Sequence, residues 1–143
     1  MLTDEKLKQE QADEEMINQA FEHLLQSYLT SKHRRKVEII TKAFNFAKQA
    51  HKGVKRRSGE PYIMHPIAVA QIACSEIGLG STSICAALLH DVVEDTDYTV
   101  EDIENLFGPK VAQIVDGLTK ISGGIFGDRA SAQAENFKKL LLT

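Results

Sequence analysis

The chain is poor in the residues that mark secreted, membrane and disulfide-rich proteins. Its 143 residues include no tryptophan and only two cysteines, Cys74 and Cys85. Both cysteines lie in apolar helical runs without the C-x-x-C spacing of a metal site, which predicts free thiols in the core. No apolar run approaches the roughly 20 residues needed to cross a bilayer, and the acidic N-terminus, MLTDEKLKQEQADEE, is unlike a secretory signal. These absences predict a soluble cytoplasmic protein without a membrane partner.

An excess of positive charge is also missing. Lys and Arg number 17 against 20 Asp and Glu, which leaves a net charge of −3. A chain without a broad cationic field is not expected to bind nucleic acid. Any binding of phosphate must therefore rely on a local group of basic residues.

Helical periodicity fills most of the chain, and no alternating strand pattern of useful length interrupts it. Helices are predicted over residues 4–28, 36–51, 65–79, 81–95, 99–108 and 109–121, with a last one beginning at residue 132 after a glycine-rich loop over 122–131, a candidate mobile segment. The length suits one domain with a single core. The sequence therefore predicts an all-α bundle of about six or seven helices.

Local signals mark several helix starts. Pro66 suits the first turn of its helix, where a missing N–H costs nothing. Ser81 or Thr82 is expected to cap the helix that contains the apolar run ICAALL, which is predicted to lie in the core. Thr99, with Asp102 three residues on, comes close to a capping box.

The stretch LLHDVVEDT places one histidine and three carboxylates at the end of an apolar helix. Spacing of four residues puts His90 with Glu94 on one face and Asp91 with Asp95 on another. A solvated helix end with clustered acids would explain this pattern. Acids at a helix C-terminus oppose the macrodipole, however, unless a cation compensates. An adjacent His and Asp offer one nitrogen and one oxygen to a divalent metal such as Mn²⁺, Fe²⁺, Zn²⁺ or Mg²⁺.

Two upstream features can complete such a site. His65 is a candidate third ligand, although a histidine before a proline is more often a capping or packing residue. The run from Lys52 to Arg57 is rich in basic residues and can bind phosphate, although alone it reads as a solvated loop. The two features lie within one break between predicted helices, which favours a shared site.

Four motifs at consistent spacing are shared with one protein family. They are RRSGEPYIMHP (56–66), AALLHDVVEDT (86–96), FGPKVAQIVDGLTKI (107–121) and QAENFKKLLL (133–142). Together they resemble the N-terminal hydrolase domain of the Rel/Spo stringent-response enzymes, within the HD superfamily of helical metal-dependent phosphohydrolases. The resemblance covers residues 37–143 as a partial hydrolase domain and leaves residues 1–36 as an N-terminal helical extension.

The resemblance implies hydrolysis of the 3′-pyrophosphate of ppGpp or pppGpp to GDP or GTP and pyrophosphate, with Mn²⁺ as the metal. In that family the residues matched by His65, His90 and Asp91 bind the metal. The residues matched by Glu94 and Asp95 are assigned to catalysis near the attacking water. Which of these two carboxylates acts as the base stays open.

The resemblance also implies a nucleotide site in the RRSG motif. The residue matched by Arg56 lies against the guanine, and Arg57 and Ser58 fall where neighbouring nucleotide contacts are expected. This chain has Arg57 where the family often has Lys, and Val54 where it often has Gln.

A fourth metal ligand of the family is an Asp in a downstream L-A-D-R-L-H-N segment, which has no match in these 143 residues. The family's synthetase and regulatory domains have no counterpart either. We therefore expect weak metal binding and little activity from this piece alone. Two alternatives stay open, namely a non-catalytic regulatory or nucleotide-binding HD module and an HD phosphohydrolase of another nucleotide.

Overall fold

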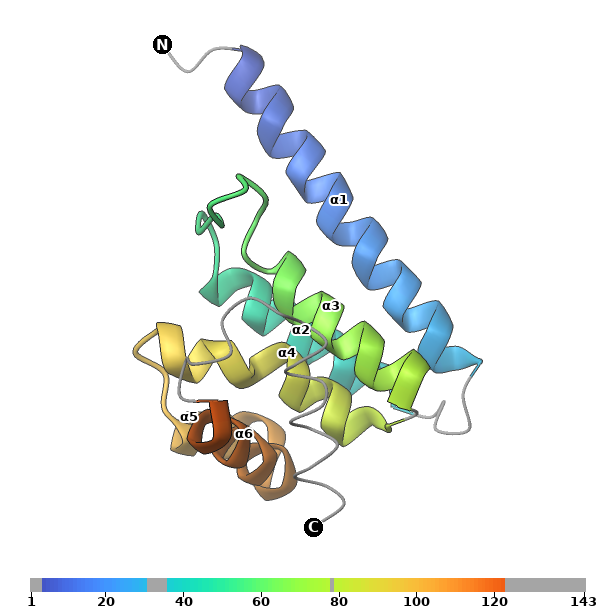
Figure 1. Ribbon diagram of the computed structural model, residues 1–143, viewed down its shortest axis with the longest axis vertical. Helices are drawn as coiled ribbons and strands as arrows, with labels where there is room; N and C mark the ends of the chain where they lie inside the picture. The colour runs from blue at the N-terminus through green and yellow to red at the C-terminus, as the bar shows by residue number, and fades with distance from the viewer. Residues whose placement is uncertain (1–3, 31–35, 78, 123–143) are drawn as a thin grey trace.

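The computed structural model describes residues 4–30, 36–77 and 79–122, and it is built of helices (Figure 1). Six α-helices and one π-helical segment, η1, occupy these residues, which contain no strand. The elements are α1 (Asp4–Leu29), α2 (Val37–Ala50), α3 (Met64–Ile72), η1 (Ala73–Ile77), α4 (Ser81–Asp95), α5 (Val100–Phe107) and α6 (Pro109–Ser122). The all-α prediction is confirmed. The expected loop over 122–131 lies almost wholly outside the described residues, and the expected last helix lies entirely outside them.

The helix α4 is the centre of the bundle. It packs against α2, α3 and α6, and in Figure 1 it runs between α3 on one side and α6 on the other. Ten consecutive residues, Ser83 to Val92, are buried. A helix that is buried all round belongs to the interior of a domain. The prediction that ICAALL forms part of the core is confirmed, because every one of these six side chains is inaccessible to solvent.

The long helix α1 lies along α3 and η1 and extends past the rest of the bundle at its N-terminal end (Figure 1). Its buried stripe continues from Ile17 through Phe21 and Leu24 to Tyr28, at the three- and four-residue steps of an amphipathic helix. Phe21 stacks on Phe44 of α2 with ring centroids 3.9 Å apart. The extension is therefore anchored in the same core as the other helices.

The helix starts were predicted with mixed success. The capping box of α5 is confirmed: the Asp102 N–H donates to Thr99 Oγ1 at 3.2 Å, and the Thr99 N–H donates to Asp102 Oδ2 at 2.9 Å. The predicted cap of α4 by Ser81 or Thr82 is wrong, because Gly80 is the N-cap and no side chain caps this helix. Ser81 already lies inside the first turn, where its hydroxyl cannot take the place of an N-cap oxygen.

The helix that begins near Pro66 is shorter than predicted. It starts at Met64 and ends at Ile72, and the chain continues as η1. Pro66 lies in the first turn of α3, as expected. Cys74 and Cys85 are both buried free thiols, which confirms that prediction. None of the described helices combines the length and the apolar character that crossing a bilayer requires.

Candidate metal centre

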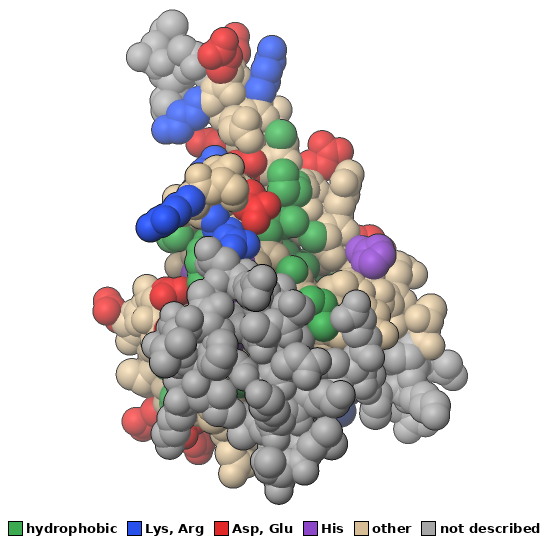
Figure 2. All heavy atoms as spheres, in the orientation of Figure 1, with side chains coloured by type: hydrophobic (Ala, Val, Ile, Leu, Met, Phe, Trp, Pro, Cys, Tyr) green, Lys and Arg blue, Asp and Glu red, His purple; other side chains and the backbone are tan. Residues whose placement is uncertain are grey.

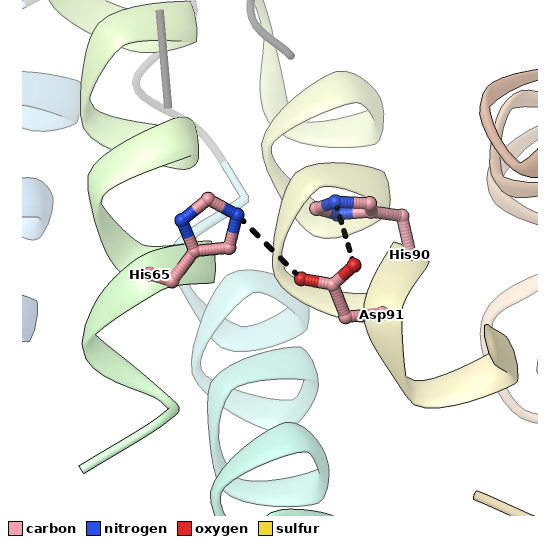
Figure 3. A group of neighbouring side chains, drawn as sticks. All are labelled: His65, His90 and Asp91. Carbon is pink, nitrogen blue, oxygen red and sulfur yellow. Dashed lines mark ion pairs between the residues drawn. The ribbon is translucent and has the colours of Figure 1, made fainter. Parts of the chain in front are cut away.

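Two helices bring three candidate ligands together. His65 lies in the first turn of α3, and His90 and Asp91 lie in the second half of α4. Because α3 and α4 pack side by side, the His65 imidazole points across the helix interface toward the Asp91 carboxylate (Figure 3). The three residues were predicted to lie together although 26 positions separate His65 from Asp91, and the packing of α3 on α4 brings them together.

The three side chains form a compact buried group. His65 Nε2 lies 3.8 Å from Asp91 Oδ2, and His90 Nε2 lies 3.1 Å from Asp91 Oδ1. One ligand atom from each residue lies within 4.8 Å of the other two. The three residues are each no more than 2% exposed, so solvent contributes little to their solvation.

The orientation of His90 is set by the backbone of its own helix. His90 Nδ1 lies 2.7 Å from the carbonyl oxygen of Ala87. Because a carbonyl can only accept, Nδ1 carries the proton in this contact, and Nε2 is the nitrogen left to face Asp91. A histidine ligand held by its other ring nitrogen in this way is typical of metal sites.

The electrostatics of the group favour a cation. Burial raises the pKa of Asp91, and the charge of His65 acts in the opposite direction. Asp91 Oδ2 is buried, and the His65 Nε2 that faces it lies 3.8 Å away, beyond hydrogen-bond distance. A buried carboxylate is costly, and a divalent ion reduces that cost. Two imidazole nitrogens and one carboxylate oxygen therefore fit a metal such as Mn²⁺, Fe²⁺ or Zn²⁺.

A cavity of about 420 Å³ is built from the segments on either side of the group. Its wall joins the end of α2 and the following loop to the C-terminal end of α4. The residues that line it are Ala50, His51, Val54, Lys55, Arg56, Arg57, Tyr62, Asp95 and Thr96. Three basic side chains thus face the same space as the Asp95 carboxylate, and this charge suits a phosphorylated ligand that is held partly by metal.

The basic loop between α2 and α3 has a defined backbone. The Tyr62 N–H donates to the Val54 carbonyl at 2.9 Å, and the Arg56 N–H donates to the Glu60 carbonyl at 2.9 Å. Gly59 closes the turn with a backbone φ of +93°, which residues with a side chain rarely adopt. Arg56 also forms an ion pair with Glu60 at 3.3 Å. Figure 2 shows Lys and Arg side chains gathered in this region, beside α1.

The structure brings most, but not all, of the predicted site residues together. The three candidate ligands lie together, and Asp95, Arg56 and Arg57 line the adjoining cavity. Glu94 is exposed and does not line the cavity, although it is near enough to Asp91 to oppose part of the rise that burial causes in the Asp91 pKa. Ser58 is exposed at the tip of the loop and is not among the lining residues.

Sequence reasoning missed His51 and Tyr62. Their rings lie 4.9 Å apart between centroids, and Tyr62 lies 6.1 Å from His65, so aromatic rings connect the cavity to the metal group. Burial raises the pKa of the Tyr62 hydroxyl, and the charges of Asp91 and Asp95 raise it further. His51 follows Ala43 and Ala47 at steps of four. The position of His51 on this apolar stripe was the signal in the sequence that it would be buried.

The pH dependence of stability is expected to report the burial of His51. Burial lowers the pKa of His51, and the charge of Asp95 partly opposes this. Near pH 6.5 and below, the unfolded chain takes up this proton before the folded protein does, so the free energy of unfolding falls as the pH falls. Replacing His51 with glutamine is expected to reduce that dependence, by at most about 1.4 kcal/mol per pH unit.

Urea unfolding at several pH values between about 5 and 7.5 measures this effect. The exposed His23 provides the matched control, and His23→Gln is expected to keep the wild-type slope. Equal slopes for the wild type and His51→Gln would contradict the prediction.

Comparison with known proteins gives consistent matches. Residues 43–143 match the HD domain family. The chain is 48% identical over 117 residues to a Vibrio cholerae protein named guanosine-3′,5′-bis(diphosphate) 3′-pyrophosphohydrolase, covering 82% of this chain and 16% of that protein. It is 44% identical over 124 residues to the Escherichia coli protein named bifunctional (p)ppGpp synthase/hydrolase SpoT, covering 87% of this chain and 17% of that protein.

A solved structure shares the fold. It is that of a metazoan ortholog of SpoT that hydrolyzes ppGpp, which matches with a TM-score of 0.57 and 28% sequence identity over 73% of this chain and 66% of that one. The chain spans about a sixth of the length of the two curated bacterial relatives.

Proposed function

The chain belongs to the HD domain family, and from this membership we propose that it hydrolyses the 3′-pyrophosphate of ppGpp or pppGpp, releasing GDP or GTP and pyrophosphate. Several curated relatives are named for this reaction. The observation that carries the proposal is the buried group of His65, His90 and Asp91 beside a cavity lined by basic side chains. Basic side chains can bind the diphosphate groups of such a nucleotide, and a metal adds positive charge at the phosphate that reacts.

We propose that His65, His90 and Asp91 hold Mn²⁺. When bound, this ion supplies the positive charge that acidifies water at neutral pH and polarises phosphoryl oxygens. His90 is held in place through Ala87, and Asp91 contributes the negative charge of the ligand set. A fourth protein ligand, the Asp of the family's L-A-D-R-L-H-N segment, would complete the set beyond residue 143.

The basic loop is proposed to bind the nucleotide. The planar guanidinium of Arg56 can stack on the guanine, and Arg57 places a second positive charge at the cavity for a phosphate group. Ser58, at the exposed tip of the loop, is proposed to contact the nucleotide at its solvent-facing edge. These contacts position the substrate and do not enter the chemical step.

The carboxylates at the end of α4 are proposed to handle protons. The oxygen of the attacking water forms a bond to the phosphorus that is attached to the 3′-oxygen. The bond between this phosphorus and the 3′-oxygen breaks, and a proton passes to the 3′-oxygen. Asp95 lines the cavity, and Glu94 lies on the same helical turn near Asp91. One of them accepts a proton from the water, and the other keeps it oriented.

The test is pyrophosphate release from ppGpp with added Mn²⁺. Two proteins are compared, this chain and an "extended chain", which continues beyond residue 143 through the family's L-A-D-R-L-H-N segment. We expect hydrolysis by the extended chain, little by the shorter one, and none after His90→Ala. Hydrolysis of deoxynucleoside triphosphates in preference to ppGpp, or no hydrolysis by the extended chain, would contradict the proposal.

A further inference from the structure

The helix α1 reaches the basic loop through one buried acid. Asp13 is only 8% exposed. Its Oδ2 accepts a hydrogen bond from Lys55 Nζ at 2.9 Å, and its Oδ1 accepts one from Gln9 Nε2 at 2.9 Å. Both carboxylate oxygens are thus occupied, one by a residue of α1 and the other by a residue of the loop.

Asp13 is the buried partner of this ion pair, and Lys55 is the exposed one. Asp13 lies four residues before Ile17, on the stripe that α1 buries against the bundle. A carboxylate on a buried stripe is tolerated only when it is paired. The hydrogen bond from Lys55 and the one from Gln9 hold the pKa of Asp13 below its usual range, so the carboxylate stays charged.

The ion pair with Asp13 restrains Lys55 at the edge of the cavity that holds Arg56 and Arg57. Lys55 directly precedes Arg56 and lines the cavity itself. Its backbone pairs with Pro61 across the loop in an isolated antiparallel bridge. Fixing Lys55 therefore fixes both arms of the loop, including Arg56 on one arm and Tyr62 on the other.

The loop has space to move if this restraint is lost. A second cavity, of about 510 Å³, lies between α1 and the loop, and Asp13, Val54, Lys55 and Pro61 are among the residues that line it. Figure 1 shows α1 passing beside this loop. Packing alone does not fill the region, and the ion pair between Asp13 and Lys55 links the loop to α1 across it.

We propose that Asp13 is a positioning residue, whose ion pair with Lys55 holds the basic loop so that Arg56 and Arg57 face the cavity. The N-terminal helix then belongs to the substrate-binding machinery. The substrate named here rests on the proposed function, whereas the restraint on the loop does not.

The first measurement is hydrogen exchange at the backbone amides of Arg56, Gly59 and Tyr62, which donate hydrogen bonds within the loop. Asp13→Asn is expected to speed their exchange about tenfold, because a hydrogen bond between two charged groups is weakened and each 1.4 kcal/mol lost is a factor of about ten. Glu14→Gln is the matched control, since Glu14 pairs with Lys48 of α2 and not with the loop.

A second measurement follows binding of ppGpp by calorimetry in the presence of a chelator, so that turnover plays no part. Asp13→Asn is expected to weaken binding about fivefold, and Asp13→Glu is expected to recover most of that loss. Mn²⁺ binding by Asp13→Asn, titrated separately without the chelator, is expected to equal that of the wild type. A variant that had lost its overall structure would bind Mn²⁺ more weakly. Lys55→Gln provides a second route to the same exchange result while leaving α1 intact.

The two proposals fail in different ways. If Asp13→Asn and Glu14→Gln show the same loop exchange as the wild type, the positioning role is wrong, whatever the substrate is. If loop exchange rises as expected but the wild-type chain binds no ppGpp, the restraint is supported and the proposed substrate is wrong.

Discussion

Replacing Asp91 with asparagine in the extended chain is expected to abolish pyrophosphate release and to weaken Mn²⁺ binding by more than about 100-fold. Among the three described candidate ligands only Asp91 carries a negative charge, and its two oxygens face His65 and His90 from one position. An amide of the same shape preserves the packing but offers a neutral oxygen. Calorimetric titration with Mn²⁺ and the pyrophosphate assay measure the two effects.

The sign of the stability change separates a ligand from a structural residue. Without metal, the Asp91→Asn protein is expected to be at least as stable as the wild type, because a buried carboxylate whose pKa is raised by burial has been removed. With Mn²⁺, only the wild type should show a rise in melting temperature. Asp97→Asn, at an exposed residue of the following loop, is the matched control. A large loss of stability in the metal-free variant would contradict the assignment.

Replacing Glu94 with glutamine or Asp95 with asparagine is expected to lower kcat by about 10²- to 10⁴-fold while leaving Mn²⁺ bound. The two variants should differ in KM. Asp95 lines the cavity among basic side chains, so removing its negative charge relieves repulsion of the phosphates and lowers KM. Glu94 lies outside the cavity lining, so its replacement should leave KM unchanged.

Steady-state kinetics of both variants in the extended chain measure this difference, with Asp97→Asn again as the control. Unchanged kcat in both variants would show that neither carboxylate takes part in proton transfer. A higher KM for Asp95→Asn would show that Asp95 contacts the substrate as a hydrogen-bond acceptor and does not repel it.

The sequence was informative where local spacing determines position. Apolar periodicity predicted the helical architecture, and the adjacency of His90 and Asp91 on one helix placed two ligand types together. His65 could be added because it begins the helix that packs on α4, although that packing itself was not visible in the sequence. The metal-binding and catalytic roles of these residues stay predictions.

Features that depend on distant contacts were not predictable. Asp13 and Lys55 lie 42 positions apart, and nothing near either residue signals that they meet. His51 was only the last residue of a predicted helix, whereas the structure buries it beside Tyr62. The cap of α4 was misjudged because Gly80, with no side chain to bond, begins the helix through its backbone alone.

The central place of α4 has a consequence for how this protein can change over evolutionary time. The helix supplies Leu88 and Leu89 to the core and the next two residues, His90 and Asp91, to the candidate metal centre. A substitution that shifts the helix to relieve packing also moves both ligands, so core and chemistry are selected as one unit. The loop that carries Arg56 and Arg57 lies outside α4, so a substitution there can change the lining of the cavity without moving either candidate ligand.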